Sequence, residues 1–194
     1  MSSAPRVILL DSCAYFRLAR SIHPLLAATF GQPPPYSLFV LDVLDDEYLT
    51  NSRLQHKFEW VSSSEYKADR WSKRYSCRGK FAQKSSEAFT FLDAYVHNCH
   101  LSLAPEDLKA LAVGFVRGIP VVSDDRCLRQ VAEVHAIECW LSLDLLKVML
   151  DCKRIDCAKV KELLELWNYE NDLPRGKVEV REWYEKVIGS GCPI

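Results

Sequence analysis

Short apolar segments alternate with helix-like segments along much of this chain, and this alternation constrains the fold more than any other feature. Residues 6 to 10 and Tyr36 to Leu41 are nearly continuous apolar runs, as in strands buried on both faces of a sheet. A helix is predicted from about Ser12 to Ala19, and a second through residues 45 to 49. Strands that alternate with helices in this way predict an α/β fold with a central parallel sheet and right-handed crossovers.

The alternation resumes in the middle of the chain. A helix is predicted from Ser86 to Asn98, and the next starts at Pro105, a favoured first helical position. Gly118 ends that helix, and a strand is expected from Ile119 to Val122. A helix from about Arg126 and a short strand near Ile137 to Trp140 follow. We therefore expect one α/β domain over 5–141 and a helical C-terminal extension over 142–194, where apolar residues recur at helical spacing.

Basic and aromatic side chains interleave between residues 53 and 84, and this stretch resembles an insertion in the α/β domain. A solvated charged loop is one interpretation of it. The other is an RNA-binding surface, on which Trp71 stacks on unpaired bases and basic side chains pair with phosphates. The basic candidates are Arg70, Lys73, Arg74 and Arg78. An alternative is that some of the aromatic residues belong to the hydrophobic core.

The bulk composition limits the function classes. The 194 residues are 48% hydrophobic and carry a formal net charge of −1, so any nucleic-acid binding has to be local. The sequence has no apolar run long enough to cross a bilayer, and we expect a cytoplasmic protein with no membrane partner. Its eight cysteines lack zinc-ligand spacing and are expected to be reduced, mostly buried thiols.

Three aspartates lie at the ends of predicted elements. Asp11 directly follows the first strand. Asp107 lies in the first turn of the helix that starts at Pro105, and Asp125 follows the next strand. That helix leaves one edge of the sheet and the strand returns to it, so both aspartates are expected at the carboxyl edge that also carries Asp11.

A fourth acid is expected from the run Asp45-Asp46-Glu47 after the second strand. Helical geometry lets only some of these side chains point at one spot, and we favour Glu47, with Asp46 as the alternative. Carboxylates this close repel one another unless a cation compensates. Mg²⁺ or Mn²⁺ suits such oxygen ligands. Taken singly, however, these acids could simply cap helices or favour a helix dipole.

Three segments together resemble a PIN domain, a nuclease fold found in toxin-antitoxin ribonucleases and in RNA-processing enzymes. They are Val7 to Ser12, Pro105 to Ala112 and Gly118 to Asp125, within roughly residues 6 to 140. The resemblance implies a PIN-like three-layer fold whose metal-binding and catalytic acids are Asp11, Glu47, Asp107 and Asp125. It also implies supporting roles for Ser123, which stands where the family usually has a threonine, and for Ser12 and Asp46.

The activity that this resemblance implies is Mg²⁺- or Mn²⁺-dependent hydrolysis of single-stranded RNA by an endoribonuclease, for which the toxin of a toxin-antitoxin pair is one role. An antitoxin-like protein would then be a partner, and the near-neutral charge is compatible with a homodimer. The alternative is a catalytically weak RNA-binding module with the same fold. A phosphoacceptor receiver domain is disfavoured because Asp11-Ser12 lacks the acidic pair that it needs, and P-loop enzymes are excluded because the chain has no GxxxxGK[ST] motif.

Overall fold

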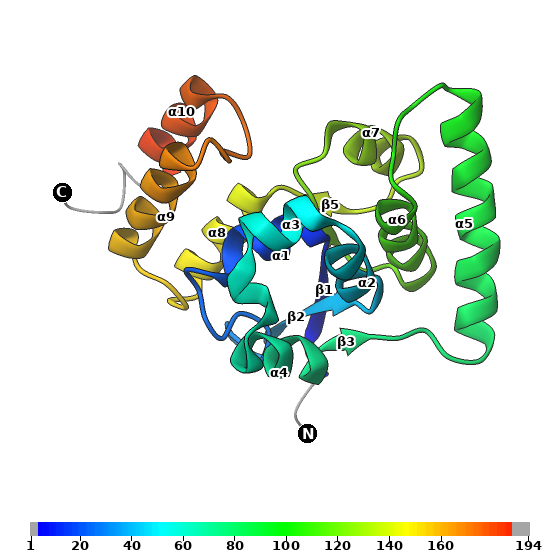
Figure 1. Ribbon diagram of the computed structural model, residues 1–194, viewed down its shortest axis with the longest axis horizontal. Helices are drawn as coiled ribbons and strands as arrows, with labels where there is room; N and C mark the ends of the chain where they lie inside the picture. The colour runs from blue at the N-terminus through cyan, green and yellow to red at the C-terminus, as the bar shows by residue number, and fades with distance from the viewer. Residues whose placement is uncertain (1–3, 188–194) are drawn as a thin grey trace.

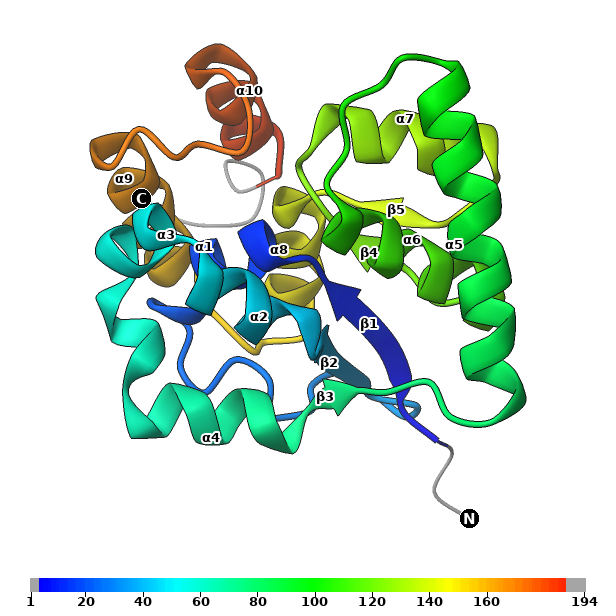
Figure 2. The same cartoon turned by 45° about the vertical axis from the view of Figure 1, so that its right-hand side comes forward.

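A five-stranded, all-parallel sheet with helices on both faces forms the centre of the molecule (Figures 1 and 2). The computed structural model describes residues 4–187. The strands are β1 (Arg6–Leu10), β2 (Tyr36–Leu41), β3 (Arg74–Tyr75), β4 (Val121–Val122) and β5 (Cys139–Trp140), in the order β3-β2-β1-β4-β5. The predicted α/β class with a central parallel sheet is therefore confirmed.

The helices cover most of the remaining chain. They are α1 (Ser12–Ala19), α2 (Val43–Thr50), α3 (Ser52–Lys57), the 3₁₀ helix η1 (Glu59–Ser62), α4 (Ser64–Ser72), α5 (Lys80–Asn98), α6 (Pro105–Arg117), α7 (Arg126–Val134), α8 (Ser142–Asp151), α9 (Cys157–Tyr169) and α10 (Lys177–Val187). The predicted bounds of β1, α1 and β2 are confirmed. Helix α5 begins six residues before the predicted Ser86, and β4 and β5 are shorter than expected.

Alternate residues of β1 explain why helices lie on both faces of the sheet. Ile8 and Leu10 pack in one cluster with α1 and α8, whereas Leu9 packs under α6 in another. Successive side chains of a strand point to opposite faces, and here both sets are apolar and buried. The sheet is thus the middle layer of three.

The strand order reverses direction next to β1. The chain passes from β1 through α1 to β2 on one side, whereas β4 pairs with the other side of β1 and continues through α7 to β5. The two connections lead away from each other at the carboxyl ends of β1 and β4. Open α/β sheets bind their ligands at such switch points.

The basic aromatic stretch over 53–84 is part of the fold and not a solvated loop. Phe58 and Tyr66 are buried, and Trp60 packs against them. At its end, Arg74 and Tyr75 form β3, which pairs with Val40 and Leu41 of β2. The sequence analysis did not expect this strand. The stretch therefore extends the sheet by one strand.

The C-terminal helices share a core with the sheet. Leu146 of α8, Val160 of α9 and Val180 of α10 belong to the hydrophobic cluster that contains α1. The indole of Trp167 donates a hydrogen bond to the backbone oxygen of Arg17, at 3.1 Å. Residue 142 thus marks the end of strand and helix alternation, while the core continues beyond it.

The cysteines differ from the expectation in two ways. Six of them are free thiols, and each of these is exposed or only partly buried; they are Cys13, Cys77, Cys99, Cys127, Cys139 and Cys152. Cys157 is disulfide-bonded, so the prediction of a reduced thiol is wrong there. Cys192 lies outside the described residues. Between residues 4 and 187, no helix is both long and apolar enough to cross a membrane.

Candidate metal centre

Asp11 occupies the first position after β1. Its carboxylate accepts a hydrogen bond from the amide of Ala14 at 2.6 Å and so caps α1. The residue is only 4% exposed. Burial raises the pKa of Asp11 from 3.8 to about 7, because loss of water outweighs the hydrogen bonds from Ser123 and Ala14, and the charges of Asp107 and Asp124 raise it further.

Helix α6 brings Asp107 to the same edge. The helix packs closely on β4, since a Cβ built on Gly114 would lie 2.6 Å from Cγ2 of Val121. Pro105 begins the helix, which places Asp107 in its first turn. Burial, followed by the charges of Asp125, Glu47 and Glu106, raises the pKa of Asp107 from 3.8 to about 6. Asp107 thus lies among other acids.

Ser123 and Asp125 follow β4 and connect this strand to Asp11. The fully buried Ser123 hydroxyl accepts a hydrogen bond from the Asp125 amide at 3.1 Å and interacts with the Asp11 carboxylate. Asp125 caps α7 by accepting from the Leu128 amide at 2.7 Å. It is exposed, yet its charge still acts on Asp107. Asp125 therefore caps a helix, which was the alternative role given to these acids, and it also lies near Asp107.

Glu47 of α2 is the acid of its run that faces the others. Its carboxylate is hydrogen-bonded by Ser12, and burial together with the charge of Glu106 raises its pKa. Asp46 is exposed, whereas Asp45 pairs with Arg70 at 2.9 Å and also with Arg74. Of Asp46 and Glu47, it is thus the charge of Glu47 that acts on Asp107. Ser12 lies beside Glu47, as a supporting residue would.

Together the acids form what we call the carboxylate cluster: Asp11, Glu47, Asp107 and Asp125. Its members come from four different elements, and Asp107 interacts electrostatically with each of the other three. Glu106, which the sequence analysis treated only as a helix-dipole residue, lines the same small cavity as Asp11 and Asp107. In the sequence, only the position of Glu106 next to Asp107 could have indicated that Glu106 lines this cavity.

The cluster fits a hard divalent cation in its chemistry but is not a closed cage. Among the residues that the structure describes, no three His, Cys, Asp or Glu side chains are arranged to hold a metal ion together. Mg²⁺ typically needs only one or two carboxylates beside several waters. Mutually repelling, partly buried carboxylates gain from such a charge. Asp11 and Asp107 could hold the ion, with Glu47 and Asp125 at its border.

A neighbouring acid, Asp124, belongs to a structural network instead. It forms an ion pair with Arg17 and accepts a hydrogen bond from the amide of Ser142 at 3.0 Å. Arg17 also contacts Asp172, which bonds to Lys57 at 3.0 Å. The network ties the segment before α10 and the start of α8 to the loop that carries Asp125. These ion pairs were not predicted from the sequence.

The five predicted RNA-binding residues differ in accessibility. Arg70 is 2% exposed and bonded to Asp45, so it has no surface to offer RNA and that prediction is corrected. Lys73 donates to the Ser37 hydroxyl at 3.1 Å, and Arg74 stacks on Trp71 with its guanidinium 4.4 Å from the ring centroid. Trp71 is 72% exposed, and Arg78 is exposed as well.

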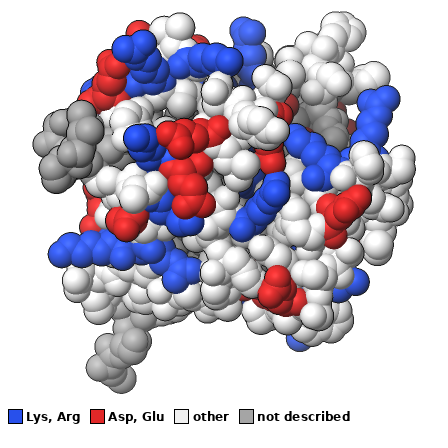
Figure 3. Space-filling view, turned by 60° about the vertical axis from the view of Figure 1, so that its left-hand side comes forward, with Lys and Arg blue, Asp and Glu red and all other residues white. Residues whose placement is uncertain are grey.

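The surface charge is mixed elsewhere. On the face in Figure 3, acidic and basic side chains lie next to one another, and neither sign covers that face. This pattern agrees with the net charge of −1. Attraction of a polyanion by the whole molecule would be weak, so any nucleic-acid contact depends on local groups.

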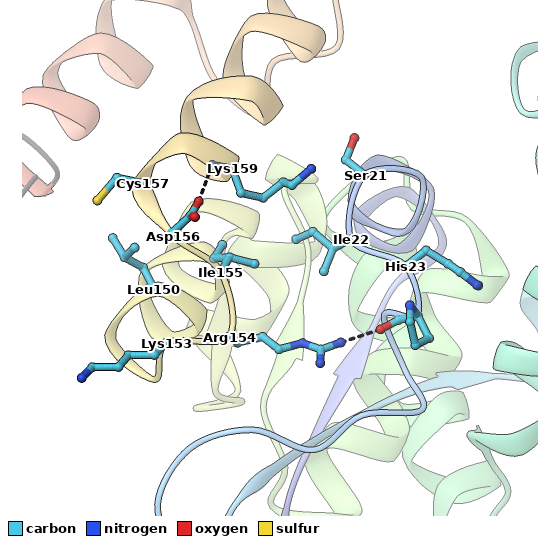
Figure 4. A pocket seen from close by; sticks show the side chains of 11 residues that line it. Ser21, Ile22, His23, Leu150, Lys153, Arg154, Ile155, Asp156, Cys157 and Lys159 are labelled. Atoms are coloured by element: carbon cyan, nitrogen blue, oxygen red, sulfur yellow. Dashed lines mark hydrogen bonds between the residues drawn. The ribbon is translucent and has the colours of Figure 1, made fainter. Parts of the chain in front are cut away.

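The largest cavity described lies away from the carboxylate cluster. It measures about 840 Å³ and separates Ser21 to Pro24, after α1, from the loop between α8 and α9 (Figure 4). Arg154 donates to the backbone oxygen of Pro24 across it, and Asp156 caps α9 through the Lys159 amide at 2.8 Å. Asp11 caps the other end of α1, and none of the four acids lines this cavity. Its polar groups thus serve mainly to join two loops.

Comparison with known proteins gives distant structural similarities alone. The crystal structure of FitAcB from Neisseria gonorrhoeae aligns with 70% of this chain and 97% of its own, with a TM-score of 0.46 and 9% sequence identity. A member of the VapBC family of toxin-antitoxin systems, VapBC-5 from Mycobacterium tuberculosis, aligns with 71% of this chain and 99% of its own, with a TM-score of 0.43 and 13% identity. No family model and no curated protein matches the sequence. Similarities at this level do not assign the chain to a family.

Proposed function

We propose that this protein is a metal-dependent endoribonuclease that hydrolyses phosphodiester bonds of single-stranded RNA at the carboxyl edge of a PIN-like domain. One observation carries the proposal: Asp11 and Asp107 line one small cavity at the carboxyl edge of the sheet, and the charges of Glu47 and Asp125 act on Asp107 there. Within residues 4–187, Asp11, Glu47 and Asp107 form no ion pair. A fold that gathers negative charge without a counter-ion suits a site that binds one.

The side chains have separate tasks in this proposal. Asp11 and Asp107 would hold Mg²⁺ or Mn²⁺, and Asp125 would complete the site from the start of α7. Glu47 would bind the metal or orient the attacking water, while Ser12 would fix the Glu47 carboxylate and Ser123 would fix Asp11. When bound, the ion supplies an activated water and neutralises charge on the scissile phosphate. No covalent enzyme intermediate is needed.

The proposed RNA surface begins at the end of α4. Trp71 offers an exposed ring for stacking on an unpaired base, and Arg74 holds that ring from one side. Arg78, in the loop before α5, would pair with phosphate, and Lys73 and Arg74 would add positive charge nearby. Since β3 is parallel to β2, this loop leaves the sheet at the edge that carries the carboxylate cluster.

The proposed ribonuclease activity leads to proposals for the partners and the cellular location of the protein. An antitoxin-like protein that covers the carboxylate cluster would keep a cytoplasmic ribonuclease inactive. A homodimer is proposed as well. Size-exclusion chromatography with light scattering tests the dimer directly, and a monomer at micromolar concentration would contradict it.

Cleavage of a labelled, mixed-sequence single-stranded RNA tests the activity. The wild-type protein should cut in Mn²⁺ or Mg²⁺ and stop when EDTA is added. Asp107→Asn should not cut, whereas Asp93→Asn, a matched change at an exposed position of α5, should cut normally. Cleavage that survives EDTA, or that Asp107→Asn retains, would contradict the proposal.

A binding module without useful turnover is the second candidate. It is favoured by the absence, within residues 4–187, of three ligand side chains arranged around one point. The same assay separates the two candidates, because such a module would retard RNA on a gel in Mn²⁺ and leave it intact.

A further inference from the structure

A second cleft adjoins the carboxylate cluster on the side of the sheet covered by α5 and α6. It has a volume of about 370 Å³, within the range of small-ligand sites. Leu41 and Val43 line both this cleft and the small cavity that contains Asp11 and Asp107. A ligand in the cleft would therefore lie directly beside the candidate metal centre. We call it the side cleft.

The lining of the side cleft combines an apolar floor with two opposite charges. Leu41, Phe89 and Ala112 contribute the apolar surface, while Asp42 and Lys109 contribute the charges. This combination suits a flat ring with polar edges, because the ring face covers apolar side chains while its edge forms hydrogen bonds.

Both charged groups are available to a ligand. Asp42 precedes α2, yet its side chain makes no capping hydrogen bond. Lys109 is exposed on α6, and it makes no ion pair with any residue between 4 and 187. A carboxylate that accepts and an ammonium that donates thus line one cleft, and neither forms an ion pair within residues 4–187.

We propose that the side cleft binds one nucleobase of the RNA, next to the phosphate that reaches the carboxylate cluster; this inference rests on the proposed function. Asp42 accepts from an exocyclic amino group, and Lys109 donates to a ring carbonyl. Cytosine and guanine carry both groups. Uracil lacks the amino group and adenine lacks the carbonyl, so the cleft should prefer cytosine or guanine.

Basic side chains around the side cleft are suited to the phosphates of an RNA strand whose base occupies the cleft. Arg78 and Lys80 are exposed in the segment that leads into α5. Arg117 at the end of α6 stacks on Phe81 at 4.2 Å and donates to the Tyr75 hydroxyl at 2.6 Å. These cations would attract phosphates whatever the base sequence, whereas the side cleft would discriminate among bases.

Binding of short oligonucleotides in EDTA tests the proposal without cleavage. Fluorescein-labelled oligo(C) and oligo(U) of equal length differ at the amino group that Asp42 would accept. Oligo(C) should bind the wild-type protein about tenfold more tightly, as expected for a hydrogen bond to a charged group. Asp42→Ala removes the acceptor and should abolish this difference by weakening oligo(C) alone, and Lys109→Gln should weaken both.

Two matched pairs of variants separate the side cleft from general effects. Ser86→Tyr should fill the cleft and abolish the preference, while Gln83→Tyr, on the same helix but outside the cleft lining, should keep it. Lys84→Gln is the charge control for Lys109→Gln. Equal binding of oligo(C) and oligo(U) by the wild type, or a preference that survives both Asp42→Ala and Ser86→Tyr, would overturn the proposal.

The outcome also distinguishes this inference from the proposed function. A protein that cleaves RNA with metal but shows no base preference in EDTA would keep its proposed activity and lose the base site. A protein that never cleaves, yet prefers oligo(C) in a way that depends on Asp42, would lose the activity and keep the base site.

Discussion

Two sets of buried or half-buried acids in this molecule have opposite surroundings. Asp69 accepts hydrogen bonds from three backbone amides, those of Leu25, Leu26 and Ala27, at 3.1, 3.0 and 2.8 Å. Asp45 has two arginine partners, Arg70 and Arg74. In the carboxylate cluster, by contrast, the strongest electrostatic neighbours of Asp107 are other acids. Acids of the first set stabilise the fold, whereas the cluster costs stability, which indicates a role outside folding.

Among the substitutions that test this difference between the two sets of acids, Asp11→Asn should have the largest effect. RNA cleavage in Mn²⁺ should fall about a thousandfold, which corresponds to roughly 4 kcal/mol of transition-state stabilisation. Asparagine also caps helices well, so the melting temperature should be unchanged or higher. Single-turnover kinetics and a thermal melt measure the two quantities. Cleavage at the wild-type rate would remove Asp11 from the mechanism.

Asp69→Ala should produce the opposite pattern. Three buried or part-buried amides lose their acceptor, so the free energy of unfolding should drop by about 3 kcal/mol in urea denaturation. The Asp69→Asn variant keeps one acceptor oxygen and should lose less. The remaining folded protein should still cut RNA at the normal rate. A stable Asp69→Ala protein would show that this acid is not structural.

Trp71→Ala sharpens the distinction between the RNA surface and the core. A stacking base contributes about 1–3 kcal/mol, so single-stranded RNA should bind about tenfold more weakly. Stability should hardly change because the ring is 72% exposed. Tyr169→Ala, at another exposed aromatic on α9, is the control. Equal affinities for the wild type and Trp71→Ala would place the RNA elsewhere.

The dependence of stability on pH gives the most specific effect. In the folded protein the pKa of Asp11 is raised to about 7 and that of Asp107 to about 6, so both hold protons that the unfolded chain releases near pH 3.8. In EDTA, their contribution to stability should therefore be fully present below about pH 4 and be lost as the pH rises to 7. Asp11→Asn should flatten this slope in urea titrations between pH 4.5 and 7.5. A slope unchanged by the substitution would show that Asp11 titrates normally.

The sequence predicts the elements whose signals are local. The apolar runs of β1 and β2 and the helix between them lie where the pattern indicates. Strand β3 has only two residues, Arg74 and Tyr75, and is a strand because it pairs with β2. That pairing joins distant parts of the chain, so no local pattern could indicate it.

In the site, too, the parts with local sequence signals were predicted and the parts that depend on distant residues were missed. Asp11, Asp107 and Asp125 could be placed at one edge because each follows or begins a regular element. The burial of Arg70 depends on Asp45, 25 residues away, and the Arg17–Asp124 pair spans 107 residues. Such partners are chosen by tertiary packing, so the number of basic residues over 53–84 overstated the surface available to RNA.

Isothermal titration of the wild-type protein and Asp107→Asn with Mn²⁺ tests the central claim, that these carboxylates converge to bind a divalent cation. The account predicts saturable binding to the wild type at pH 7.5, weaker binding at pH 5.5 where protons compete, and at least about tenfold weaker binding to Asp107→Asn. Identical titration curves for the two proteins, or no heat of binding to the wild type at all, would contradict it.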